Sequence, residues 1–242
     1  MPELDGLLPI FAIVALSTSA HCLWLRRRAW RSSYDRAATL SVALEGLAIL
    51  LMTPLIGPHI GFALHWLTGL WHMQYLLAHW LLFAGGACAI AHFLTRLGDD
   101  HTVRIFFRRC VELPLALTLP LMLATFALSS INRAPTDFLL SPPDTWLKAY
   151  WIIGCLMGLR LITCALHCLT ILRREQRHRA VADIYILGCI AGLIFIATQL
   201  TTVFAQTPRP AIAPLVTGCI TITLFAWSAT YSWRHRLNRT AE

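Results

Sequence analysis

The sequence predicts an all-α, polytopic membrane protein with seven transmembrane helices. Of its 242 residues, 57% are hydrophobic and 13% are charged, whereas soluble domains carry about 25% charged residues. The stretch from Trp71 to Thr95 runs for 25 residues without Asp, Glu, Lys or Arg, and about 20 apolar residues suffice to cross a bilayer. The arginines fall in short clusters between such runs, as they do in the loops of membrane proteins.

The apolar runs define the expected spans, which together form one transmembrane domain over residues 1–242. The first run precedes a cluster of arginines, which is the reverse of a cleavable signal peptide, whose charges come first. A shorter glycine- and aromatic-containing segment, residues 57–70, is expected to be interfacial or re-entrant. The spans are expected at about 7–25, 37–56, 71–95, 111–131, 146–172, 181–204 and 215–233.

Two prolines fall within the fourth expected span. Pro114 lies in its first turn, where the missing N–H leaves no helical hydrogen bond unmade. Pro120 is internal and predicts a kink.

The distribution of basic residues predicts the orientation in the membrane. The segments 26–36, 96–109 and 173–179 and the tail from residue 234 contain five, four, four and three arginines, sixteen in all. The opposite side carries only Arg133, Lys148 and Arg209. Because cytoplasmic loops are enriched in Lys and Arg, the N-terminus is expected outside and the C-terminus in the cytoplasm.

Composition and motifs exclude several classes of function. The net charge of +8 sits in loops between apolar spans, so it favours anionic lipid at the cytoplasmic face and not nucleic acid. The eight cysteines lie in apolar runs or at their boundaries, which argues against a disulfide framework. Lys148 is the only lysine and lies at the outer end of a span, which argues against a retinal Schiff base. Common enzyme motifs such as H-E-x-x-H and G-x-S-x-G are absent.

Small residues indicate which helices pack together. Gly154 and Gly158 form a G-x-x-x-G motif on the fifth span, and Gly188 and Gly192 form another on the sixth. This spacing lets two helix backbones approach closely in lipid. Alternatively, these are glycines of the kind that membrane helices contain in general.

Polar residues at membrane depth are the candidates for a functional site, because they are costly there unless they are paired or used. Glu45 on the second span and Arg160 on the fifth stand out. They could form an ion pair, or Arg160 could reach the third span at Gln74, Tyr75 or His79. A buried polar pair that only fixes the register of the helices is the structural alternative.

Three histidines recur at similar depth near the inner ends of spans. His21, His92 and His167 each occupy the second position of a short apolar string and are followed by arginine within four to six residues. Imidazoles at one level could ligate a transition metal, or two of them could ligate haem. Alternatively, they are amphipathic side chains placed near the interface.

Short strings along the chain resemble an uncharacterised actinobacterial family of multi-pass membrane proteins that are classed as transporters. The residues that carry the resemblance are Thr53-Pro54, Leu76-Leu77-Ala78-His79 and the arginine-rich loop before the glycine-containing sixth span. The resemblance implies a transporter of the plasma membrane and supplies no catalytic residues.

The leading interpretation is therefore a bacterial multi-pass protein of the plasma membrane that transports or senses a small solute. Its polar interior is expected to include Glu45, Arg160, His79, Gln74 and Tyr75, without a required cofactor. The alternatives are a haem- or metal-binding redox subunit and a non-catalytic subunit that binds another membrane protein.

Overall fold

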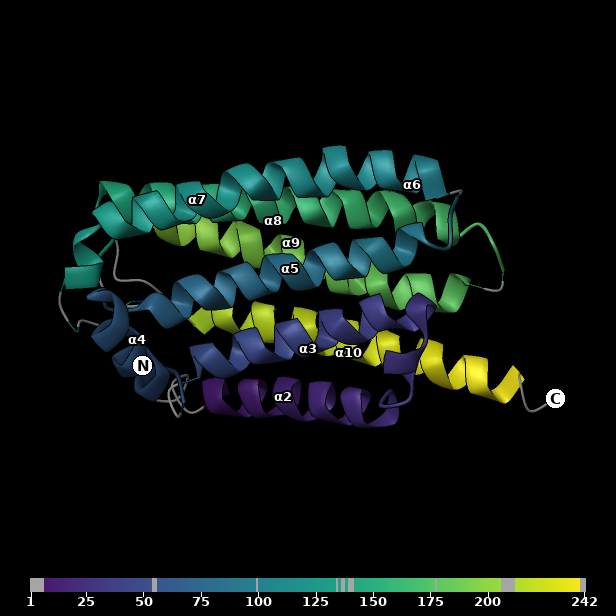
Figure 1. The fold of residues 1–242 in the computed structure, drawn as a ribbon. Helices are drawn as coiled ribbons and strands as arrows, with labels where there is room; N and C mark the ends of the chain where they lie inside the picture. Colours follow the sequence, from purple (N-terminus) through teal and green to yellow (C-terminus); the bar gives the residue numbers. More distant parts are fainter. Residues whose placement is uncertain are drawn as a thin grey trace.

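The computed structural model describes residues 7–53, 56–98, 100–133, 135, 138, 142–176, 178–205 and 212–239, and all regular secondary structure within them is helical (Figure 1). The all-α prediction is thereby confirmed. The long helices are α2 (Leu7–Leu25), α3 (Ser33–Met52), α5 (Met73–Leu94), α7 (Leu113–Leu128), α8 (Thr145–Leu172), α9 (Arg179–Phe204) and α10 (Ile212–Arg239). The shorter helices are η1 (Ala29–Arg31), α4 (Gly57–Thr68), α6 (Asp100–Phe107), the π-helix η2 (Arg108–Glu112) and η3 (Ser130–Arg133).

The long helices lie side by side in one bundle (Figure 1). Helix α3 packs on α2 and α5, α5 packs on α8, α8 on α9, α9 on α10, and α10 closes the ring against α2. Helix α7 lies outside this ring against α8 and α5. The N-terminal pair α2 and α3 is therefore joined to the C-terminal helix α10, far from it in sequence.

Five described helices are long and apolar enough to cross a membrane, and a bent pair formed by α3 and α4 would make a sixth. The apolar part of α2, Pro9–Leu25, is shorter than these. The chain is thus built as a multi-pass membrane protein.

Residues 57–70, expected to be interfacial or re-entrant, contain α4, whose axis turns by 86° from that of α3. The twelve residues of α4 lie across one end of the bundle (Figure 1). Its exposed face carries Phe62, Trp66 and Leu67, with 64%, 82% and 71% of their surfaces exposed. Large apolar and aromatic side chains at the end of a bundle are suited to the lipid–water boundary.

The start of the fourth span differs from the prediction, which placed a loop at 96–109. Helix α6 begins at Asp100 and continues through the π-helix into α7, so one apolar unit covers His101–Leu128. The arginines of this segment are exposed, while Val103 and Phe106 pack against the core. An amphipathic helix can therefore form where a count of charges indicates a loop.

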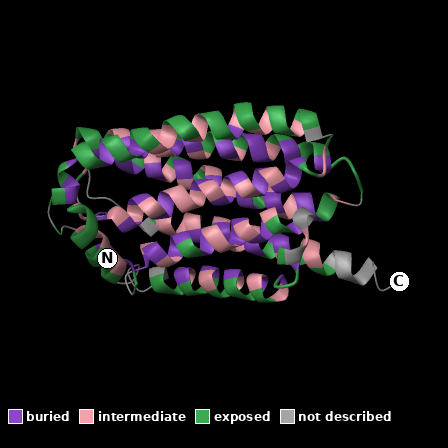
Figure 2. Ribbon diagram, in the orientation of Figure 1, coloured by how far each residue is buried: buried purple, intermediate pink, exposed green. Residues whose placement is uncertain are grey.

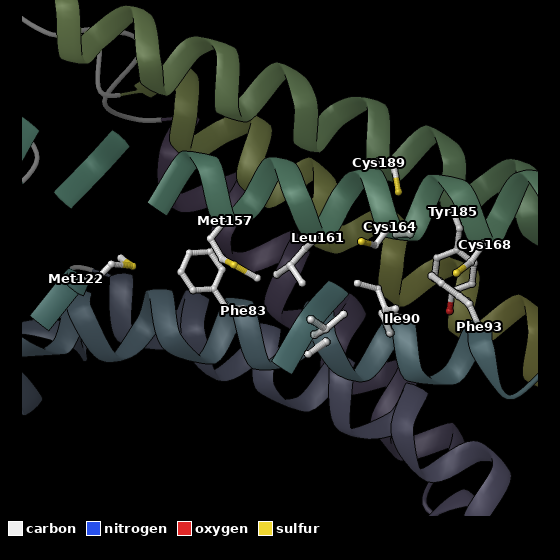
Figure 3. Packing of buried hydrophobic residues seen from close by; sticks show 14 of the residues in the cluster. Phe83, Ile90, Phe93, Met122, Met157, Leu161, Cys164, Cys168, Tyr185 and Cys189 are labelled. Atoms are coloured by element: carbon white, nitrogen blue, oxygen red, sulfur yellow. The ribbon is translucent and has the colours of Figure 1, made fainter. Parts of the chain in front are cut away.

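The apolar core lies between α5 and α8 and is completed by α7 and α9 (Figure 3). Phe83, Ile90 and Phe93 of α5 face Met157 and Leu161 of α8. Buried residues follow the inward faces of the helices, and exposed residues follow the outer faces of α2, α6 and α7 (Figure 2). The outward faces of α7 and α8 are largely apolar, with Leu117 and Leu156 exposed by 68% and 61%.

Gly158 and Gly192 lie in the contact between α8 and α9. A Cβ atom added to Gly158 would lie 3.3 Å from Cδ1 of Ile196, and one added to Gly192 would lie 2.8 Å from Cδ1 of Ile162. The two glycines therefore allow close approach of the same pair of helices.

The other glycine of each motif faces a different neighbour. A Cβ atom on Gly188 would lie 2.8 Å from Cδ2 of Phe225 on α10. One on Gly154 would lie 3.4 Å from Cε of Met122 on α7, an ordinary van der Waals distance. The two G-x-x-x-G motifs thus do not form a single paired interface.

We expect Gly192→Leu to destabilise the bundle by about 1–3 kcal/mol, because the added side chain overpacks the contact with Ile162. Gly154→Ala is the matched control and should leave the melting temperature in detergent nearly unchanged. Equal melting temperatures for wild type and Gly192→Leu would show that α8 and α9 are not held at this separation.

Asp144, the N-cap residue of α8, joins the start of α8 to Ser129 and Ser130 after the end of α7. Its Oδ1 accepts a hydrogen bond from the Leu147 amide at 2.7 Å, and its Oδ2 accepts one from the Ser130 hydroxyl at 2.8 Å. Partial burial favours the neutral acid, but the hydrogen bonds from Leu147, Ser130 and Ser129 outweigh it and hold the pKa of Asp144 below its ordinary value.

Because the pKa of Asp144 is lower in the folded state, its contribution to stability is present above the ordinary pKa and is lost as pH falls through the folded value. We expect the wild-type melting temperature to fall more steeply than that of Asp144→Asn between about pH 5 and pH 2. Asp144→Ala, which also removes the cap, should be less stable than Asp144→Asn at neutral pH. Parallel pH profiles for wild type and Asp144→Asn would contradict this role.

Candidate functional site

Glu45 is buried in the contact between α3 and α5, with 6% of its surface exposed. The hydroxyl of Ser41, one turn earlier on α3, donates a hydrogen bond of 2.9 Å to Oε1 of Glu45. Gly85 of α5 makes room for the side chain, since a Cβ atom there would lie 2.8 Å from Cγ of Glu45. No ion pair joins Glu45 to another residue in the described part of the chain. The carboxyl group therefore has a hydroxyl partner but no counter-ion.

The hydroxyl-bearing residue Ser41 also lines a small enclosed cavity. His92 of α5 and Tyr185 of α9 line the same cavity, whose volume is about 10 Å³. His92 and Tyr185 are both buried, with 2% and 5% exposed. A space of this size holds at most one water molecule. We call Ser41, Glu45, His92 and Tyr185 the inner polar site.

The side chains of the inner polar site are of types that can exchange protons. A carboxyl group, a hydroxyl group, an imidazole and a phenol can each donate and accept hydrogen bonds in at least one protonation state. They come from three different helices, α3, α5 and α9. A small relative movement of these helices would therefore change the distances between these groups.

Arg26 is the largest side chain that is almost completely buried, with 1% exposed. Its Nη1 donates to the Ala229 carbonyl at 2.8 Å, its Nε donates to the Thr39 hydroxyl at 3.1 Å, and its Nη2 lies 3.8 Å from Oδ1 of Asp35. The guanidinium also lies over the Trp233 ring, 5.5 Å from its centroid. Arg26 therefore ties the end of α2 to the start of α3 and to α10. The sequence alone predicts instead that Arg26 lies in the arginine-rich loop at 26–36.

We expect Arg26→Gln to destabilise the folded protein by about 3–5 kcal/mol, because it breaks the buried ion pair with Asp35 and the hydrogen bonds of the guanidinium to Thr39 and Ala229. Arg28→Gln is the matched control: Arg28 belongs to the same cluster but is exposed, and its loss should change stability by less than about 0.5 kcal/mol. Denaturation in detergent measures both. A similar small effect for the two variants would mean that the guanidinium of Arg26 is solvated.

Arg160 is exposed on the outer side of α8 and does not pair with Glu45. Its Nε donates to the Cys110 carbonyl at 3.0 Å, and its Nη2 donates to the Arg109 carbonyl at 3.3 Å. Pro114 explains these bonds. It has no N–H for the Cys110 carbonyl four residues earlier or for the Arg109 carbonyl in the π-helical pattern.

Pro114 lies in the first turn of α7, as predicted, but the π-helix runs directly into α7, so the missing N–H still leaves carbonyl groups to be satisfied. Arg160 supplies the missing donors from the neighbouring helix, as membrane proteins commonly do around prolines. This contact separates Arg160 from the inner polar site.

His79 and Tyr75 lie together at the other end of α5, facing α8. Nδ1 of His79 is 2.7 Å from the Tyr75 carbonyl and 2.9 Å from the Tyr150 hydroxyl. The His79 ring packs edge-on against the Trp151 ring, with centroids 5.1 Å apart. The Tyr75 ring stacks on Phe138 at 4.6 Å. This aromatic cluster is packed and hydrogen-bonded within the chain.

Gln74 faces α4 and not the aromatic cluster. Its side chain is 5% exposed and fills the space over Gly61, where a Cβ atom would lie 2.5 Å from Oε1 of Gln74. That oxygen has no hydrogen-bond partner among the described residues. The five residues expected to form one polar interior are thus divided among four places.

The three histidines proposed as ligands also occupy different environments. His92 is buried at the inner polar site, while His21 and His167 are exposed. The His167 ring stacks on Phe106 with centroids 6.1 Å apart, and the His21 ring lies 6.4 Å from that of Trp24. Among the residues that the structure describes, no group of three or more His, Cys, Asp or Glu side chains has an arrangement that could hold a metal ion. A haem or metal site at these histidines stays a prediction.

Sequence reasoning missed Ser41, Tyr185 and Arg26. Ser41 precedes Glu45 by four residues, a helical spacing that places the two side chains on one face. This signal could have been found. Tyr185 and the burial of Arg26 depend on packing with distant helices and leave no comparable signal.

Neither a scan against protein-family models nor a search of curated proteins finds a match to this chain.

Proposed function

We propose that this chain is a small-solute transporter or membrane sensor of the bacterial plasma membrane, with its polar intramembrane site at Glu45. The observation that carries the proposal is the buried carboxyl group of Glu45, which has a serine partner but no counter-ion among the described residues. Acidic residues inside a membrane domain are rare and commonly mark ion, proton or substrate pathways. Membership of the actinobacterial family that the sequence resembles forms part of the same proposal.

The proposed protein has seven spans, with its N-terminus outside the cell. Helix α2 has 19 residues and is about 28 Å long, close to the ~30 Å of a hydrocarbon core. Counting it with the six candidate spans gives seven. The sixteen arginines on one side then lie in the cytoplasm, where they can bind anionic lipid or a membrane protein partner.

Glu45 would bind a proton or a small cation near the middle of the membrane. It lies twelve residues from the start of α3 at Ser33, which corresponds to about 18 Å along the helix. Ser41 bonds to Glu45 and, together with His92 and Tyr185, lines a cavity on the side of Glu45 that faces the arginine-rich end of the bundle. The cavity beside them holds about 10 Å³ and is too small for an organic solute, so a larger solute would require α3 and α5 to separate.

Gly85 is the point at which that separation would begin. A Cβ atom there would lie 3.2 Å from Oε1 of Glu45 and 3.3 Å from the Ser41 carbonyl. The contact of Gly85 with Glu45 and Ser41 is close and polar. Because Gly85 has no side chain, α5 does not project a side chain into α3 at this position. Binding at Glu45 would therefore bias the spacing of these two helices, which is a physical basis for either gating or signalling.

We expect a pH-difference infrared spectrum of the protein in lipid to contain a carboxyl band that disappears in Glu45→Gln. Glu112→Gln is the matched control, because Glu112 is exposed and its loss should leave that band in place. In proteoliposomes carrying a pH gradient, Glu45→Gln should also lose any solute-dependent proton flux of the wild type. A titrating band and flux that survive in Glu45→Gln would reject Glu45 as the site.

A further inference from the structure

The outer face of α8 carries a groove that the proposed function does not use. It lies between α8 and the segment formed by α6 and the π-helix, and its volume is about 580 Å³. Phe106, Leu156 and Leu159 supply apolar surface, while Arg160 and His167 supply polar groups. The volume is within the range of small-molecule sites, roughly 300–1,000 Å³.

Arg160 places a hydrogen-bond donor in this groove near the middle of the bilayer. It lies twelve residues from the end of α8 at Leu172, about 18 Å along the helix. Two of its nitrogens are held by the carbonyls of Arg109 and Cys110, and Nη1 has no bond among the described residues. The guanidinium is therefore fixed in place with one donor group to offer.

Two thiols line the same groove. Cys110 comes from the π-helix and Cys164 from α8, and both side chains line the groove beside Arg160. Both are free cysteines. Two thiols that line one groove can be oxidised to a disulfide when their Cα atoms lie within about 7 Å of each other and an oxidant reaches them.

The depth of the groove decides which ligand suits it. Phospholipid phosphates lie outside the ~30 Å hydrocarbon core, whereas Arg160 lies about 18 Å from the inner end of α8. A headgroup would have to be drawn deep into the hydrocarbon to reach it. A neutral ring with carbonyl acceptors dissolves at this depth, can accept a hydrogen bond from Nη1, and can pack against Phe106.

We propose that this groove binds a lipid-soluble quinone, which oxidises the dithiol of Cys110 and Cys164. An S–S bond forms between the two cysteines, and both S–H bonds are broken. The two electrons and two protons pass to the quinone, which leaves as the quinol. Arg160 positions the quinone by donating a hydrogen bond to one carbonyl oxygen. This reaction is independent of Glu45.

The test uses the full chain in lipid nanodiscs, reduced and then freed of reductant and oxygen, with decylubiquinone as the probe. We expect one quinol to form per chain, followed by ultraviolet absorbance, and a Cys110–Cys164 disulfide to appear in peptide mass spectra. Cys110→Ser and Cys164→Ser should each abolish quinol formation. Cys189→Ser is the matched control, because this thiol is buried away from the groove, and it should react like the wild type.

A second pair of variants tests the groove itself without altering a thiol or Arg160. Leu156→Trp fills the groove and should slow quinol formation about tenfold or more. Leu187→Trp, at an exposed apolar position on α9 outside the groove, should not. Absence of quinol with the wild type, or an unchanged rate in Leu156→Trp, would overturn the proposal, as would a groove that retains only phospholipid in native mass spectra.

Discussion

Polar groups inside this bundle must find their partners within the chain, because the hydrocarbon around it supplies none. Arg26 shows the consequence most clearly. Its guanidinium donates hydrogen bonds to the Thr39 hydroxyl and to the backbone carbonyls of Ala229 and Asp35, and it pairs with the Asp35 carboxylate. It thereby joins α2, α3 and α10. The contact between α2 and α10 thus combines this buried cation with apolar packing of Ala15 and Cys22 against α10.

Arg160 satisfies backbone carbonyls in the same way, on the exposed face of α8. The proline at 114 and the π-helix before it leave two carbonyls without amide partners, and the guanidinium of Arg160 binds both. An apolar residue at that position would leave these carbonyls facing lipid. The irregular segment and the arginine thus belong to one structural unit, and this unit also forms the wall of the groove on α8.

Glu45 differs from Arg26 because its surroundings, in the described part of the chain, supply a hydrogen bond to its carboxyl group but no opposite charge. Ser41 supplies one hydrogen bond, and Gly85 supplies space, yet no cation lies within ion-pair distance among the described residues. Arg26 and Glu45 are both buried, but only Arg26 has its charge balanced by the fold. This contrast is why we assign a structural role to the arginine and propose a functional role for the acid.

The sequence by itself determined the helical class and the approximate extents of α8 and α9, and it identified Glu45 as an acid within an apolar run. Each of these depends on composition over a few helical turns, or on the presence of an acid in an apolar run. Only the tertiary structure decided that Arg26 is inside and Arg160 is outside. The partners that fix them, Ala229 and Cys110, are 203 and 50 residues away, and the side of a helix that faces the bundle depends on how all its neighbours pack. Hydropathy records how apolar a segment is, but it does not record which carbonyls a distant proline leaves without a partner.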